Sequence, residues 1–213
     1  MDHNQIAVEV FDSKAEQYQA RFMDVGAYSE SFDLFLERLP SENASLLEVA
    51  CGPGNITRYL LDQRPKLRIL GTDLAPNMVA LARKNNPEAE FQLMDARKIG
   101  ALDRRFDGIV CGFCFPYFNK AEALQLIADA AKLLHPGGVL YLSTMEGGYL
   151  DEGKLVTSSD GTATLRLFLH EKNYLVAELE RRGFRSISAT CQDFVVEGEV
   201  QFVDLLIVAK KEE

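Results

Sequence analysis

One segment constrains the fold more than any other: an aliphatic run leads into a glycine turn and then into a helical pattern. The run Leu46–Val49 meets Ala50-Cys51-Gly52-Pro53-Gly54, and the helical pattern begins at Ile56. In α/β sheets such a turn lies at the carboxyl end of a strand, against a helix N-terminus that favours a polar ligand. Glycines at 52 and 54 let the backbone approach that ligand closely. Glu48 lies within this apolar run, and burying its carboxylate is costly unless another group compensates its charge.

Two later runs each end on an acidic residue. Residues 67–73 are predicted to form a second strand that ends at Asp73, and residues 91–95 a third that ends at Asp95. Asp73 follows the glycine turn by about 20 residues, the spacing at which a carboxylate meets ribose hydroxyls. The three strand ends therefore predict a polar rim along one edge of a sheet.

Together with the segment Leu133–Leu140, these motifs resemble those of S-adenosylmethionine-dependent methyltransferases with a Rossmann-like fold. The family's usual motif is an acid followed by Gly-x-Gly-x-Gly, and this chain departs from it mildly with Ala50 at the first glycine. The resemblance covers residues 10 to 210 approximately. It implies an α/β fold with a mostly parallel seven-stranded sheet, helices on both faces and an antiparallel last strand.

The resemblance also implies the function and the cofactor site. The function is methyl transfer from S-adenosyl-L-methionine to a small-molecule acceptor. The cofactor-binding residues carried over from the family pattern are Tyr18 in a lid helix; Glu48, Ala50, Gly52, Gly54 and Cys111 near the methionine moiety; Asp73 on the ribose; Leu74 and Met78 against the adenine; and Asp95 and Ala96 at the adenine amine.

An N-terminal helical lid is expected over residues 1–40. Gln5 to about Tyr18 shows an amphipathic pattern with Ile6, Val10 and Phe11 on one side, and residues 32–39 predict a second helix that ends at Pro40. In the resembling family such helices fold over the cofactor. Tyr18 is the first candidate for a lid contact and Tyr28 a weaker one, although both tyrosines fit a packing role equally well.

Residues 146–170 are expected to form a β-hairpin insertion after the fifth strand, around an Asp160-Gly161 turn. Its position over the crevice suggests that it confers substrate choice. The candidate catalytic residues are Glu146, Tyr149 and His170, which could bind an amine or take a proton.

The segment Phe115-Pro116-Tyr117-Phe118 differs from the Asn/Asp-Pro-Pro-Tyr element of amino-group methyltransferases, which argues against methylation of DNA bases or glutamine. It leaves open an aromatic wall for an apolar or cationic substrate. Cys111 and Cys114 form a C-x-x-C pair, but the histidines are isolated from one another, so buried thiols are expected rather than a zinc or other metal site.

Two other functions fit part of this pattern. A nicotinamide-dependent oxidoreductase shares the sheet and the ribose acid, but Thr57 stands where its third glycine would be. A non-catalytic regulatory protein that binds S-adenosylmethionine also fits, because no catalytic base is evident.

Composition limits the class further. A chain of 213 residues that is 47% hydrophobic can bury one substantial core, so residues 1–213 are expected to form a single domain. The net charge of −9 argues against nucleic acid and anionic membrane partners. The sequence shows neither a signal segment nor a membrane span, so a cytoplasmic location is expected. The identity of the acceptor, the atom methylated and the oligomeric state stay open.

Overall fold

The computed structural model describes residues 3–157, 161, 164–196 and 198–212, and its centre is a seven-stranded sheet. The strand order is β3-β2-β1-β4-β5-β9-β8, and β9 runs antiparallel to both of its neighbours. The strands are β1 (Ser45–Val49), β2 (Arg68–Asp73), β3 (Glu90–Leu93), β4 (Phe106–Cys111), β5 (Leu134–Glu146), β8 (Phe184–Val196) and β9 (Glu199–Lys211). The predicted α/β fold, with its antiparallel last strand, is confirmed.

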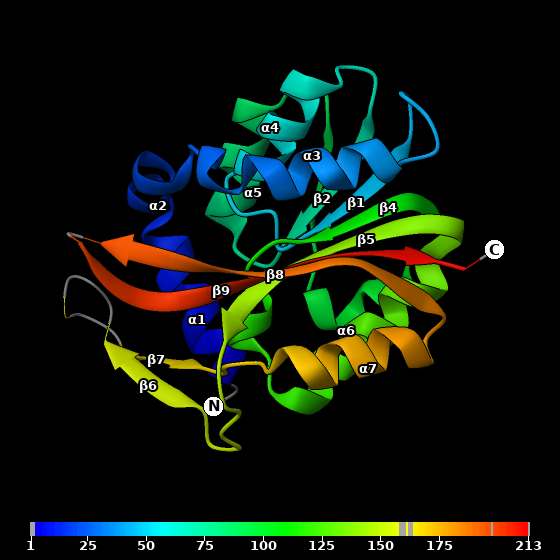
Figure 1. Ribbon diagram of the computed structural model, residues 1–213. Helices are drawn as coiled ribbons and strands as arrows, with labels where there is room; N and C mark the ends of the chain where they lie inside the picture. The colour runs from blue at the N-terminus through cyan, green and yellow to red at the C-terminus, as the bar shows by residue number, and fades with distance from the viewer. Residues whose placement is uncertain (1–2, 158–160, 162–163, 197, 213) are drawn as a thin grey trace.

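Helices cover both faces of this sheet (Figure 1). The helices are α1 (His3–Ser13), α2 (Ala15–Phe22), α3 (Ser29–Arg38), α4 (Asn55–Gln63), α5 (Pro76–Asn85), α6 (Lys120–Leu133) and α7 (Lys172–Arg181), with 3-10 turns η1 (Gly26–Tyr28), η2 (Ala96–Ala101) and η3 (Phe115–Tyr117). Helices α3, α4 and α5 lie on one face, and α6 and α7 lie on the other. Among the described residues, none of the helices is long and apolar enough to cross a membrane.

Each face packs its own hydrophobic core. On one side Phe32 and Phe35 of α3 pack with Tyr141 of β5, all three nearly inaccessible to solvent. On the other side the side chains of α6 and α7 pack against alternate residues of β1, β4, β5 and β9. Because both faces of the sheet are buried, the central strands are continuously apolar. Strands with one solvent-exposed face would instead alternate between apolar and polar residues.

The helix ends follow their local sequence signals. Pro76 begins α5, where its missing N–H costs nothing. Asn119 and Glu122 form the predicted capping box of α6. Gly183 follows α7 with a φ of +79°, the left-handed conformation that a glycine provides at a helix end.

The N-terminal helix predicted from Gln5 to about Tyr18 is instead two helices separated at Lys14, whose φ is −112°. The Ser13 hydroxyl donates to the Val10 carbonyl at 3.0 Å, a local bond that competes with the helical ladder. The buried face also differs from the predicted one, because Ile6 is 37% exposed whereas Ala7 and Ala15 are buried. The second predicted helix agrees with α3, which ends before Pro40.

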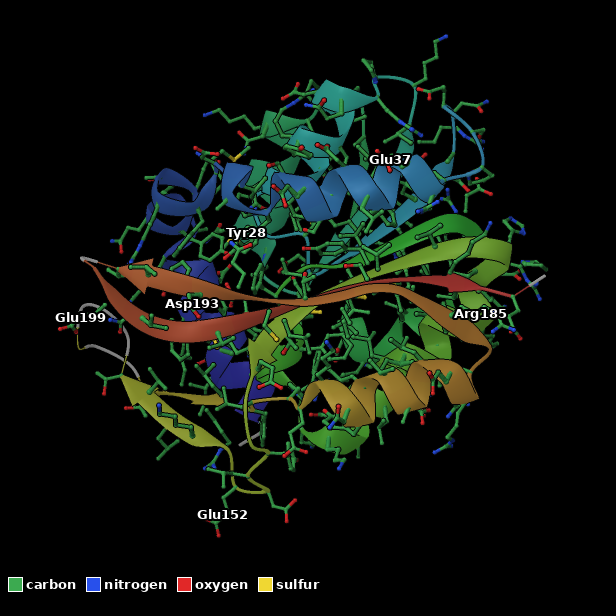
Figure 2. All side chains as sticks on the ribbon, in the orientation of Figure 1. Tyr28, Glu37, Glu152, Arg185, Asp193 and Glu199 are labelled. Atoms are coloured by element: carbon green, nitrogen blue, oxygen red, sulfur yellow. The ribbon has the colours of Figure 1, made fainter. Side chains whose placement is uncertain are left out.

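The predicted hairpin insertion is present as a separate two-stranded sheet of β6 (Lys154–Thr157) and β7 (Thr164–Leu167). Most of its predicted turn lies outside the described residues. Strands β8 and β9 are longer than the predicted 185–190 and 201–209, because they pair with each other as far as Val196 and Glu199. Figure 2 places Arg185 at one end of this β8–β9 hairpin and Asp193 and Glu199 towards the other.

Candidate active site

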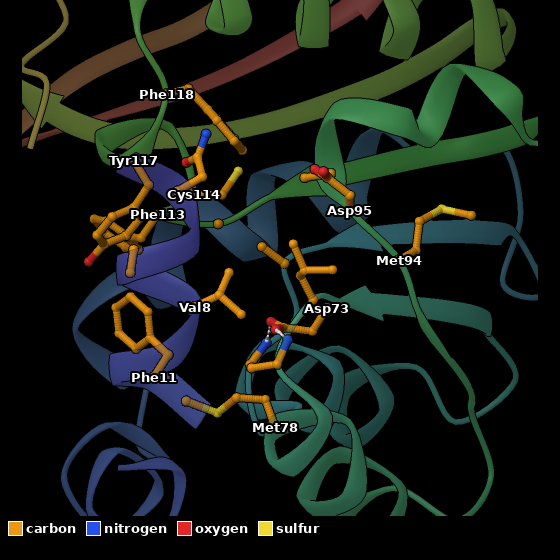
Figure 3. Close-up of a pocket in the computed structure, with 18 of the residues that line it drawn as sticks. Val8, Phe11, Asp73, Met78, Met94, Asp95, Phe113, Cys114, Tyr117 and Phe118 are labelled. Atoms are coloured by element: carbon orange, nitrogen blue, oxygen red, sulfur yellow. Dashed lines mark hydrogen bonds between the residues drawn. The ribbon is translucent and has the colours of Figure 1, made fainter. Parts of the chain in front are cut away.

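A pocket opens at the carboxyl ends of β1, β2 and β4, between these strand ends and helix α1 (Figure 3). Residues from the glycine turn, the two predicted strand-end acids, the lid helix and the segment after β4 meet there. The lining residues are Asn4, Ala7, Val8, Phe11, Tyr18, Ala50, Gly52, Asp73, Leu74, Ala75, Met78, Met94, Asp95, Ala96, Gly112, Phe113, Cys114, Tyr117 and Phe118. The pocket lies where ligands settle in open α/β sheets, outside the carboxyl ends of the strands.

The glycine turn forms the floor of this pocket. Ala50, Gly52 and Gly54 have φ values of +53°, +53° and +77°, in the left-handed region. A Cβ on Gly54 would lie 2.4 Å from the Asn86 amide nitrogen, so only glycine fits there. A Cβ on Gly52 would meet only the Tyr18 ring, at 3.8 Å, so the turn leaves room for a ligand between the floor and the lid.

Asp73 is fixed at the centre of the pocket by backbone donors. The Gly52 N–H donates to Oδ2 and the Ala75 N–H to Oδ1, both at 2.9 Å. Burial raises the pKa of Asp73, although these hydrogen bonds to its charged form act in the opposite direction. Asp73 and the glycine turn, which were predicted to share one edge of the sheet, are therefore in direct contact.

Asp95 lies on the same rim of the pocket and is part of a network of ion pairs. Arg97 donates to both carboxylate oxygens of Asp95, with the shortest distance 2.8 Å from Nη2. Partial burial acts to raise the pKa of Asp95, but the Arg97 contacts outweigh it and the pKa is lowered. Arg97 also contacts Glu122 at 3.4 Å, and Glu122 accepts from the Asn4 amide at 3.1 Å. This chain of contacts connects the rim to the first turn of α1.

Glu48 lies beneath the floor rather than on the lining. Its side chain is 1% exposed, its Oε2 accepts from the Thr57 hydroxyl, and its Oε1 has no hydrogen-bond partner. Burial raises the pKa of Glu48 to about 8, with Asp73 adding to the shift and Thr57 opposing it. The buried carboxylate therefore has capacity for a further donor or cation.

Helices α1 and α2 dock on the strand-end loops through side chains. Asp12 accepts from the Asn77 N–H at 2.7 Å, at the beginning of α5. Asn85 donates to Gln19 of α2 at 2.7 Å and to the Pro53 carbonyl at 2.8 Å. These bonds place Tyr18 above Gly52, and burial raises the pKa of Tyr18 to about 12, with a smaller contribution from Asp73.

Eight of the eleven residues predicted for the cofactor line this pocket: Tyr18, Ala50, Gly52, Asp73, Leu74, Met78, Asp95 and Ala96. Glu48, Gly54 and Cys111 belong to the layer behind it. Hydrogen bonding with Cys114 and burial raise the pKa of the Cys111 thiol. Sequence reasoning missed Asn4, Ala7, Val8, Phe113 and Cys114, because their approach depends on how α1 and the loop after β4 fold.

The three candidate catalytic residues do not lie among the lining residues. Glu146 accepts from the Lys172 N–H at 3.4 Å at the start of α7. The Tyr149 hydroxyl accepts from the Lys120 N–H at 3.0 Å, and its ring stacks on Phe168. Glu146 thus contacts α7, and Tyr149 contacts the first residue of α6. Their catalytic roles stay predictions.

His170 is fully buried, and both of its ring nitrogens are occupied. Nε2 lies 2.8 Å from the Phe115 carbonyl, which can only accept, so Nε2 carries the proton. Nδ1 then accepts from the Tyr174 hydroxyl. Burial lowers the pKa of His170, which favours this neutral form. The arrangement leaves no free lone pair on His170 for a substrate proton, and its catalytic role also stays a prediction.

Residues 46–138 match the methyltransferase domain family. The chain is 36% identical to the trans-aconitate 2-methyltransferase of Variovorax paradoxus over 106 residues, which cover 49% of this chain and 40% of that protein. It is 32% identical to the demethylmenaquinone methyltransferase of Thermotoga maritima over 142 residues, covering 64% and 60%. The matches thus span about half the length of these relatives.

Solved structures share the whole architecture. The 1,6-didemethyltoxoflavin-N1-methyltransferase of Burkholderia thailandensis, solved with 1,6-didemethyltoxoflavin and S-adenosylhomocysteine, has a TM-score of 0.71. The alignment covers 100% of this chain and 91% of that one, at 22% sequence identity. At this identity the likeness establishes the fold, which is the Rossmann-like fold of methyltransferases.

Proposed function

We propose that the protein transfers a methyl group from S-adenosyl-L-methionine to a small-molecule acceptor, because residues 46–138 of this chain match the methyltransferase domain family. The observation that carries the proposal is the convergence of Gly52, Asp73 and Asp95 in one pocket. Each comes from a different strand end, and the resemblance assigns each to a different part of the same cofactor.

The residues present fit that cofactor. Asp73 would hold the ribose hydroxyls, and Asp95 would hold the adenine amine. The unpartnered Oε1 of Glu48 provides an acceptor for a cationic amino group near the floor. Gly52 leaves a space that a larger residue would fill. When bound, the cofactor supplies a methyl group on a sulfonium, which already carries a good leaving group.

The protein's own part is then mainly alignment and exclusion of water. The backbone N–H groups of Gly52 and Ala75 hold Asp73 in one orientation. Phe11 and Tyr18 from the lid, together with Tyr117, cover the pocket with apolar surface. We keep Glu146 and Tyr149 as candidates for proton transfer, and His170 as a candidate that would first have to release its hydrogen bond from Tyr174. We also keep residues 146–170 as the segment that confers substrate choice.

The net charge and the length of the chain bear on its partner and its domain organisation. We propose that the partner is a small molecule rather than nucleic acid, since the net charge of −9 opposes contacts to phosphates. We propose that residues 1–213 act as a single methyltransferase domain in the cytoplasm.

Calorimetry with S-adenosylhomocysteine tests the cofactor assignment directly. We expect one binding site per chain, with an affinity at least about tenfold weaker when Asp73 is replaced. A screen of acceptors with S-adenosylmethionine, followed by release of S-adenosylhomocysteine, then tests catalysis. A folded protein that binds neither cofactor form would refute the proposed function. Binding without turnover across a broad acceptor panel would support the non-catalytic alternative instead.

A further inference from the structure

The pocket is divided into two chemically different parts. One part, which we term the acceptor half, consists of Val8, Phe11, Phe113, Tyr117 and Phe118. Figure 3 shows these residues on the side of α1 and the loop after β4, with Asp73, Asp95, Met78 and Met94 on the other side. The acceptor half carries no strand-end acid and none of the residues assigned to the cofactor.

The aromatic rings of the acceptor half stand edge to face. The rings of Phe11 and Tyr117 are 5.1 Å apart at an interplanar angle of 86°. Phe11 and the lid residue Tyr18 are 5.7 Å apart at 84°. An aromatic ligand can extend this arrangement, because aromatic rings favour edge-to-face and offset-stacked contacts with one another.

The charges around the pocket have one sign. Its charged lining residues are Asp73 and Asp95, and its described lining includes no lysine, arginine or histidine. The guanidinium of Arg97, next to the lining residue Asp95, is engaged by Asp95 and Glu122. An anionic acceptor buried here would lose its hydration beside Asp73 and Asp95, and the described lining offers no basic side chain to pair with it.

Phe113 is held firmly as part of the wall. Its φ of +52° is unusual for a bulky residue, and its N–H donates to the Ser143 hydroxyl at 3.0 Å. Behind it the Tyr28 ring lies 5.0 Å from the Phe113 ring, and the Tyr28 hydroxyl bonds to Asp204. Strained backbone that its surroundings hold in place is typical of functional sites. The wall is therefore preorganised, and the group behind it is a further carboxylate.

From these features we infer that the acceptor half selects a planar aromatic acceptor that carries no negative charge, and rejects acceptors that carry a carboxylate. This inference rests on the proposed function, because the ligand would have to occupy the pocket next to the cofactor. It goes beyond it by assigning the class of the acceptor.

Two probes with the same ring system and different charge test the inference. Protein saturated with S-adenosylhomocysteine is titrated with 2-naphthol, which is uncharged at neutral pH, and with 2-naphthoate. We expect 2-naphthol to bind at least about tenfold more tightly. Phe11→Ala should weaken 2-naphthol binding by about tenfold, because it removes one ring of the wall.

Phe22→Ala is the matched control, since Phe22 is a half-buried lid phenylalanine that contacts Tyr18 and is not a lining residue. It should leave 2-naphthol affinity within about twofold. Equal or tighter binding of 2-naphthoate, or equal effects of the two phenylalanine variants, would overturn the inference while the cofactor still binds. Failure of the folded protein to bind S-adenosylhomocysteine would instead overturn the proposed function and this inference with it.

Discussion

The hydroxyl of Tyr28 donates a 2.7 Å hydrogen bond to the carboxylate of Asp204, which lies 176 positions later in the chain. Asp204 is 3% exposed, and no described cation pairs with it. In the same hairpin, Gln192 donates to the Ala27 carbonyl at 3.1 Å. Strands β8 and β9 therefore hold η1 against the sheet, and they support the Phe113 wall of the pocket through Tyr28.

Tyr28→Phe should destabilise the protein by about 1–3 kcal/mol, because it leaves a buried carboxylate oxygen without its donor. Urea unfolding at neutral pH measures the change. Tyr59→Phe is a matched control: Tyr59 donates to Asp33 over the same 2.7 Å, but at an exposed site. We expect the control to cost less than about 1 kcal/mol. If both variants lost the same free energy of unfolding, burial of Asp204 would not add to the stability that its hydrogen bond provides.

Asp73→Asn should weaken S-adenosylhomocysteine binding by at least about tenfold, since charge-assisted hydrogen bonds to the ribose become neutral ones. The variant retains one carbonyl oxygen for two backbone donors, so one N–H loses its acceptor, and the free energy of unfolding without ligand should fall by about 1–3 kcal/mol. Asp107→Asn serves as control, because Asp107 also accepts a backbone N–H, from Ser45 at 2.8 Å, but at the opposite end of β1. Loss of affinity in both variants would point to a general effect on folding.

Much of the site could be predicted because its signals are local. The glycine turn and the strand-end positions of Asp73 and Asp95 are each encoded within a few residues, and parallel pairing of β1, β2 and β3 brings them to one edge. The capping box at Asn119 and Glu122 is local as well. For these features, hydrophobic periodicity and turn chemistry were sufficient.

The acceptor half could be predicted only in part, because it depends on contacts between distant segments. The aromatic segment after β4 was noted, but the partnership of Phe11 with Tyr117 requires α1 to dock on α5. The apolar pattern of α1 predicted the wrong buried face, since Ile6 is exposed and its neighbour Ala7 is buried. Asp204 gave no local signal, because its partner Tyr28 comes from the other end of the chain.

Gly54→Ala and Ala50→Gly should differ in their cost to stability, although both lie in the same turn. The first places a Cβ 2.4 Å from the Asn86 amide at a φ of +77°, and it should destabilise the protein by about 1–3 kcal/mol. The second relieves a left-handed alanine at a φ of +53° but adds chain entropy, so unfolding free energy should change by less than about 1 kcal/mol. Urea unfolding of both variants provides the test. A Gly54→Ala protein as stable as the wild type would contradict the close approach of Gly54 to Ala82 and Asn86.

The raised pKa of Glu48 should make the free energy of unfolding fall as the pH rises. Its pKa rises from an ordinary 4.5 to about 8 in the fold, so the native state keeps a proton that the unfolded state releases. The stabilisation that this proton gives is complete below the ordinary pKa and is lost as pH rises towards about 8. Relative to Glu48→Gln, the wild type should therefore lose stability across this window, by at most about 1.4 kcal/mol per pH unit.

The same carboxylate should make cofactor binding release a proton at neutral pH. A cationic amino group placed near Glu48 Oε1 would favour the ionised form and lower the pKa of Glu48 again, so the proton passes to the buffer. Calorimetry with S-adenosylhomocysteine in buffers of different ionisation enthalpy measures this release. Glu48→Gln should abolish it. Glu178→Gln, which alters a buried glutamate paired with Arg181 and Arg182 far from the glycine turn, should not. Tight binding by the wild type with the same enthalpy in every buffer would remove Glu48 from the cofactor site.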